Sequence, residues 1–270
     1  HIGADPNRFF AALLIQFAHL CDHDALELLH EVRSDGQIDQ FARQGAAAGR
    51  IIEVRIVTHG HSHVGMTQKI GNHPKLNAAL NKGLDAGLSI REAKEILVQL
   101  YAYAGFPRSL NALGELMKVL DERKQRGVQD AVGRVPERAI PKGDALLAAG
   151  TANQTRLLGG PVQGALFDFA PAVDEYLKTH LFGDIFERDN LDWQSRELAT
   201  VGMLSALPGA ESQLQAHMRI SMNVGLTAGQ LHQLTQVLGD RVDAEHARRA
   251  REALAKHLAT LPRATAAATR

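Results

Sequence analysis

The amino-acid sequence predicts an all-α fold, and three observations support this prediction. From residue 73 onward, apolar residues recur at three- and four-residue spacing within runs of Ala, Leu, Glu, Gln and Lys, the periodicity of amphipathic helices. Alternating strand patterns are nearly absent, and segment 51–57 is the one short candidate. A helix–glycine–helix pattern also occurs twice.

The composition is that of a globular protein without a strong electrostatic field. The 270 residues suffice for one large or two modest domains, and 45% are apolar and 22% charged. Lys plus Arg equal Asp plus Glu at 30 each, so no long-range field draws nucleic acid or an anionic membrane to the chain. We therefore expect neither partner, and expect local Arg or Lys side chains to hold any anionic ligand.

Cysteine content and hydropathy exclude further classes. Because Cys21 is the single cysteine, the chain has no internal disulfide and no paired-thiol redox cycle. No segment approaches the roughly 18 apolar residues that span a bilayer. Segment 9–20 is favoured as a buried helix, with a targeting remnant as the alternative. A cytoplasmic location is favoured, and a periplasmic one stays open because the chain starts at His1 rather than Met.

Residues 1–72 are not assigned to a known kind of domain, although 24–32 has the pattern of an amphipathic helix. His59, His61 and His63 resemble the zinc-binding signature of metallo-β-lactamase-like hydrolases. The acid that usually precedes the third histidine is missing, and no later series of metal ligands follows. We therefore favour a histidine-rich loop and expect no metal, and a fusion or frameshift origin of this region stays open.

The repeated pattern joins two helices through a glycine. Segments 76–89 and 214–227 align at an offset of 138 residues (225 minus 87), which places Gly87 on Gly225. Glycine suits the end of a helix because it adopts the left-handed conformation at little cost. Two such units indicate a duplication with two similar subdomains.

The second helix of each unit is expected to begin at a capping box. Ser89 is followed by Glu92, and Thr227 by Gln230, so the hydroxyl and the acid or amide satisfy free backbone donors reciprocally. The predicted organisation is a first repeat, a linker, a second repeat and a disordered tail, over residues 73–125, 126–162, 163–260 and 261–270.

Three further helices are expected in addition to the two helix–glycine–helix units. The linker carries a short helix near 144–149 among prolines and glycines. Helical periodicity over 167–182 is expected to end at Gly183. Asp192 is typical of an N-cap for a helix over 193–207.

Four segments resemble, in the right order, the carboxymuconolactone decarboxylase family: 103–113, 181–188, 191–201 and 217–227. The resemblance implies duplicated helical hairpins of the alkylhydroperoxidase-D-like kind, with no metal or organic cofactor. It also implies a homo-oligomer, which for a tandem chain would be a trimer or similar. One branch of the family decarboxylates intermediates of aromatic-acid breakdown, and another reduces peroxides with a Cys-x-x-Cys pair.

The resemblance also assigns the site. Glu197 and His217 stand where the family has its Glu and His, whereas the cysteine positions fall on Ala210 and Gln213. Thiol chemistry is therefore absent there. In the first repeat the position matching His217 is Ala79, which indicates a structural half without its own site.

Glu197 shares a helical face with apolar residues, and a carboxylate beside an imidazole fixes its tautomer and raises its basicity. We predict His217 as general acid/base and Glu197 as its orienting partner. Arg219 or Arg196 would hold the carboxylate of a small anionic substrate, although an ordinary solvated arginine is the favoured alternative for Arg219.

The leading interpretation is a cofactor-independent decarboxylase resembling 4-carboxymuconolactone decarboxylase. A same-fold enzyme of other chemistry, such as a thiol-free peroxidase relative or a lactone hydrolase, is the first alternative. A non-catalytic oligomeric scaffold with a structural Glu–His pair is the second. Tyr101, Tyr103, Phe106 and Arg108 of the first repeat are candidates for a pocket wall, with a core role favoured for the aromatics.

Overall fold

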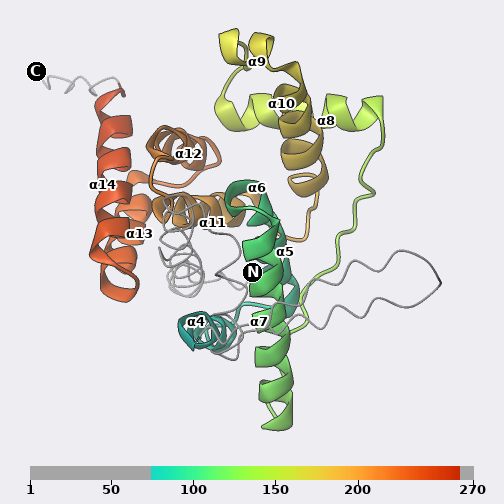
Figure 1. The fold of residues 1–270 in the computed structure, drawn as a ribbon, viewed down its shortest axis with the longest axis vertical. Coiled ribbons are helices and arrows are strands. Elements are labelled where there is room, and N and C mark those ends of the chain that lie inside the picture. Colours follow the sequence, from blue (N-terminus) through green and yellow to red (C-terminus); the bar gives the residue numbers. More distant parts are fainter. Residues whose placement is uncertain (1–73, 262–270) are drawn as a thin grey trace, which may run out of the picture. The chain divides into compact units, whose positions relative to one another are not determined.

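Every regular element that the computed structural model describes is helical (Figure 1). The described residues are 74–261, so Cys21, the histidine-rich segment and the candidate strand, for which predictions were made above, lie outside them. This part confirms the all-α class. Its elements are α4 (Pro74–Asp85), α5 (Ile90–Gln99), α6 (Tyr101–Ala104), α7 (Phe106–Gln125), α8 (Asp144–Leu158), α9 (Ala165–Phe169), α10 (Pro171–Tyr176), the π-helix η2 (Leu177–Ile185), α11 (Trp193–Ser205), α12 (Glu211–Asn223), α13 (Ala228–Arg241) and α14 (Ala244–Ala259).

The two helix–glycine–helix units, α4–α5 and α12–α13, have the same local geometry. Gly87 and Gly225 have φ of +99° and +100°, in the left-handed region that glycine tolerates. The amide of the following leucine donates to Gly83 in the first unit and to Ser221 in the second, at 3.0 Å in both. Both predicted capping boxes are formed. Duplication of the whole subdomains stays a prediction.

Helix α11 packs into two hydrophobic cores at once. Leu198 and Leu204 belong to the core with α12, α13 and α14, whereas Ala199 and Met203 belong to the core with α4, α5 and α7. Every residue over 195–205 is buried. Both halves of the described unit therefore pack against α11 and hold its side chains in place.

The predicted linker contains a full-length helix. Helix α8 continues to Leu158 instead of ending near residue 149, and it packs against η2. Gly150 allows the close approach, because a Cβ atom there would lie 1.7 Å from the Lys178 carbonyl oxygen. The extended, proline-containing part covers 128–142.

The helix predicted over 167–182 is interrupted once, at Ala170, and α10 then continues directly into η2. Pro171 begins α10 and separates it from α9. Gly183 lies inside η2 rather than ending a helix, and a Cβ atom there would come within 2.8 Å of Leu146. Gly183 thus serves close packing. None of the helices described over 74–261 is long and apolar enough to cross a membrane.

Candidate active site

Helices α11 and α12 pack against each other and bring Glu197 to His217. The Asp192 side chain accepts a hydrogen bond from the Ser195 amide at 2.7 Å and starts α11, as predicted, so Glu197 lies in its second turn. The His217 Nδ1 atom lies 2.7 Å from Glu197 Oε2. The two side chains that the sequence singled out are therefore in direct contact.

The pair is almost completely withdrawn from solvent. The Glu197 side chain is fully buried, and the His217 side chain is 11% exposed. A buried carboxylate requires a hydrogen-bonding partner, and the imidazole supplies it. Since Nδ1 is engaged by Glu197, Nε2 is the ring nitrogen left to exchange a proton with another molecule.

Tyr103 of α6 brings the first half of the described unit to this pair. Its ring lies edge-on to His217, with the centroids 5.6 Å apart. Burial, and then the charge of Glu197, raise the pKa of Tyr103. The nearby Thr200 side chain offsets part of this increase. No hydrogen bond of ordinary geometry reaches the buried Tyr103 hydroxyl.

Three buried polar atoms of this region have hydrogen-bonding capacity that the described fold does not use. They are the Tyr103 hydroxyl, Glu197 Oε1 and the Ser221 hydroxyl, one helical turn after His217. Most buried polar groups in proteins have a partner. The unused atoms therefore mark a place where a bound molecule would gain hydrogen bonds.

Arg196 does not lie at the pair. Its guanidinium is fully buried and reaches Glu95 of α5 at 3.2 Å. Arg188 adds three hydrogen bonds to the same carboxylate, of 2.6–3.0 Å, and Asn190 adds one of 3.0 Å. Burial would raise the pKa of Glu95, but these bonds and the two arginine charges outweigh it and lower the pKa. The position of Arg196 does not support the substrate-binding role predicted for it, because its guanidinium is fully buried and bonded to Glu95.

Arg219 also lies away from the pair. It is exposed, two residues after His217 and thus on a different face of α12. Its charge acts on His257 of α14, because burial and then Arg219 lower the pKa of that histidine. The solvated alternative fits this position better than substrate binding.

The positions of the family's cysteines lie at the start of α12. Ala210 precedes the helix and Gln213 is exposed in its first turn. Within residues 74–261, no three His, Cys, Asp or Glu side chains gather as they would around a metal ion.

The fold and the site together define an all-α protein with a buried acid–imidazole pair between two neighbouring helices. Residues 171–256 match the model of the carboxymuconolactone decarboxylase family, and this range contains both Glu197 and His217. Through these residues the chain is similar to that family, which also includes peroxidase-like members. The comparison with curated proteins gave no significant match.

Proposed function

We propose that the protein is a cofactor-independent carboxy-lyase that removes carbon dioxide from a small carboxylated lactone, as 4-carboxymuconolactone decarboxylase does. The observation that supports this most directly is the 2.7 Å contact between the buried Glu197 and His217. The contact places an imidazole, which can donate or accept a proton, beside the negative charge of a carboxylate in a site with little access to solvent.

In this proposal, the carbon–carbon bond to the carboxylate breaks and carbon dioxide leaves. The electron pair passes into the lactone as an enolate, and His217 donates the proton that quenches it from Nε2. Glu197 stays ionised and stabilises the imidazolium before the transfer. Solvent then returns a proton to His217. The reaction is redox-neutral, which fits a site with Ala210 and Gln213 in place of the thiols.

Substrate binding is assigned to the groups around the pair rather than to Arg196 or Arg219. The imidazolium of His217 offers a positive charge, and the Tyr103 hydroxyl offers a donor that is not otherwise used. Both suit the carboxylate or carbonyl oxygen of a small lactone.

The test is carbon dioxide release from 4-carboxymuconolactone. We expect release by the wild-type chain and a loss of about 10²–10⁴-fold in His217→Ala, the range for a general acid–base residue. His232→Ala, which removes an exposed histidine of α13, is the matched control and should keep full activity. Undiminished release by His217→Ala would overturn the assigned roles.

The low solvent exposure of Glu197 and His217 favours the alternative of a non-catalytic scaffold. Neither residue lines the cavity that lies between α8 and the α9–α10 segment. Under this alternative the wild type releases no carbon dioxide, and His217→Ala loses stability alone. A peroxidase-like relative would instead reduce peroxide with Cys21 replaced.

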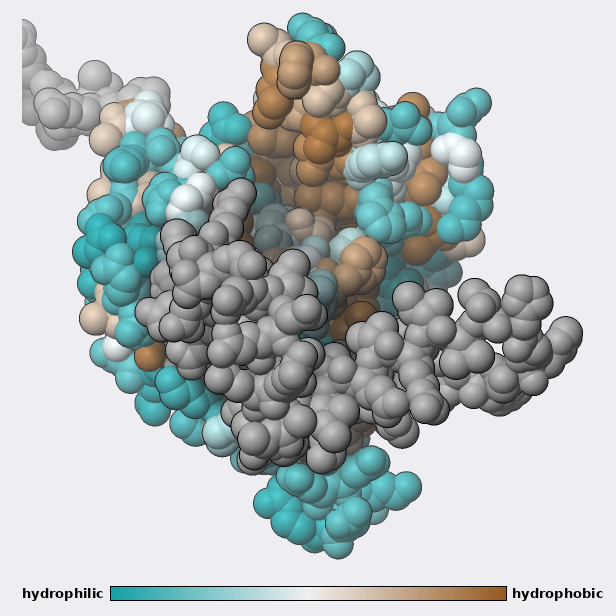
Figure 2. Space-filling model, in the orientation of Figure 1, coloured by the Kyte–Doolittle hydropathy of each residue, from teal (hydrophilic) through white to brown (hydrophobic). Residues whose placement is uncertain are grey.

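We also propose that the chain forms a homo-oligomer. Apolar side chains project from α7 and from α9–α10, and Phe169 is 88% exposed. In Figure 2 hydrophobic residues face a hollow beside α9 and α10. A stack between Tyr101 and Phe106, with centroids 4.3 Å apart, lies at the start of the α7 row. Exposed apolar patches of this kind mark association sites. The exposed members are Phe106, Leu110, Met117, Leu166, Phe169, Val173 and Tyr176.

A further inference from the structure

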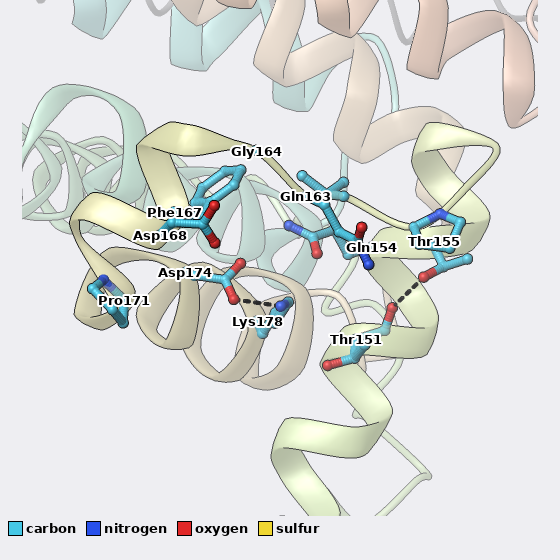
Figure 3. A pocket seen from close by; sticks show the side chains of 12 residues that line it. Thr151, Gln154, Thr155, Gln163, Gly164, Phe167, Asp168, Pro171, Asp174 and Lys178 are labelled. Atoms are coloured by element: carbon cyan, nitrogen blue, oxygen red, sulfur yellow. Dashed lines mark hydrogen bonds and ion pairs between the residues drawn. The ribbon is translucent and has the colours of Figure 1, made fainter.

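A cavity of about 940 Å³ lies between α8 and the α9–α10 segment. Its walls come from α8, the loop after it, α9, α10 and the start of η2, and include neither Glu197 nor His217. Figure 3 shows Gln154 and Thr155 on the α8 side and Phe167, Asp168 and Asp174 on the other. A volume of this size accommodates a small organic molecule.

Buried polar groups of the wall are the first indication of a ligand. Gln154 is 3% exposed and lines the cavity together with Asp174, whose buried Oδ1 atom has no hydrogen-bond partner within residues 74–261. Asn153, the neighbour of Gln154 and also buried, donates to the Phe182 carbonyl at 2.9 Å and to Glu187 at 2.6 Å. Buried polar groups are normally satisfied in this way. The Asp174 Oδ1 atom, which lacks such a partner, is thus available to a donor in the cavity.

The other polar groups of the wall are mostly acceptors. The Thr151 and Thr155 hydroxyls each donate to a carbonyl one turn earlier, at 2.7 and 2.9 Å, so they present lone pairs to the cavity. Lys178 pairs with Asp174. Asp168, which is exposed, adds a second carboxylate to the wall, where Lys178 is the one basic side chain among the lining residues. The wall therefore favours a positively charged donor and disfavours an anion.

Apolar groups complete the cavity. Phe167 lies beside Asp168, and Pro161, Val162 and Pro171 add hydrocarbon surface. An aromatic face next to a carboxylate attracts an organic ammonium group. We propose that this cavity binds a small organic cation, an amine joined to a short apolar group. The site is separate from the proposed decarboxylase chemistry and does not depend on it.

The experiment uses the full chain and three probes of similar size: benzylamine, benzyl alcohol and benzoate, at neutral pH, by isothermal titration calorimetry. We expect saturable binding of benzylamine to one site per chain, weaker binding of the alcohol and none of benzoate. Added salt should weaken benzylamine binding, because the interaction includes a charge pair.

Variants locate the site. Asp168→Asn and Gln154→Leu should each weaken benzylamine binding about tenfold or more. Glu175→Gln, an exposed carboxylate on the same segment that does not line the cavity, is the matched control and should bind as the wild type does. Asp168 is exposed, so its replacement keeps the fold. Equal binding of benzoate and benzylamine, or unchanged binding in Asp168→Asn, would overturn the proposal.

Discussion

At the scale of single residues, His217 is fixed by two contacts of different kinds. Glu197 engages Nδ1 on one side, and the edge-on ring of Tyr103 packs nearby. Both contacts orient the imidazole without occupying Nε2. A side chain held in this way loses little further freedom when it reacts, which is the benefit of preorganisation.

Replacing Tyr103 by phenylalanine separates these contributions. The change keeps the ring and removes a buried hydroxyl without a partner, so the free energy of unfolding should change by less than about 1 kcal/mol. Carbon dioxide release should fall about tenfold, because the proposed donor to the substrate is lost. Urea unfolding and the decarboxylation assay measure the two effects. Full activity in Tyr103→Phe would assign the tyrosine to packing alone.

The sequence located the pair but not its surroundings. Glu197 and His217 were predictable because each lies in a recognisable local motif. The partner of Arg196 is Glu95, 101 residues away, and no local pattern reports such a contact. One signal was present: Glu95 and Gln99 are four residues apart on the buried side of their helix.

At the scale of elements, the Glu95 network joins α5 to α11. Glu95→Ala would leave the fully buried Arg196 without its partner and should cost roughly 3–5 kcal/mol of stability. Arg219→Ala, at an exposed position, should stay within about 0.5 kcal/mol of the wild type. Chemical denaturation of both variants measures the difference, and similar values would contradict a structural role for the network.

The same network predicts an acid dependence. Because the pKa of Glu95 is lowered in the folded protein, its contribution to stability is present above the ordinary pKa of 4.5. That contribution is lost as the pH falls through the lowered folded pKa. In Glu95→Gln, the decline in stability below pH 4.5 should therefore be shallower than in the wild type.

The contact of α8 with η2 makes a further prediction. Gly150→Ala would place a methyl group against the Lys178 carbonyl and push the helices apart, at a cost of about 1–3 kcal/mol. Gly160→Ala is the matched control, because a Cβ atom there meets nothing within 4 Å. Thermal unfolding compares the two, and equal melting temperatures would contradict the tight crossing.

Local signals explain which elements were predictable. Both capping boxes were found from the sequence because every participant lies within four residues. Helix α8 was underestimated because its many small residues form no strong apolar stripe, and the π-helix has no sequence signature of its own. Helix α8 is stabilised by packing against η2 rather than by apolar periodicity of its own sequence.

At the scale of the whole molecule, the proposed self-association follows from exposed apolar rows. The wild type should sediment as an oligomer at micromolar concentration, and Phe169→Asp should shift it toward the monomer, because a charge would be buried at the contact. Glu175→Gln should leave the distribution unchanged. Analytical ultracentrifugation distinguishes these outcomes, and a monomeric wild type would contradict the proposal.

Helix α11 is expected to tolerate few amino-acid substitutions. With each residue over 195–205 enclosed by one core or the other, the helix offers no outward side on which a change is harmless. In a saturation screen for folded protein, positions in α11 should accept fewer amino acids than those in α13 or α14, which keep exposed faces. A change at one of these positions would have to be compensated within the core that encloses it, so such positions are expected to vary slowly.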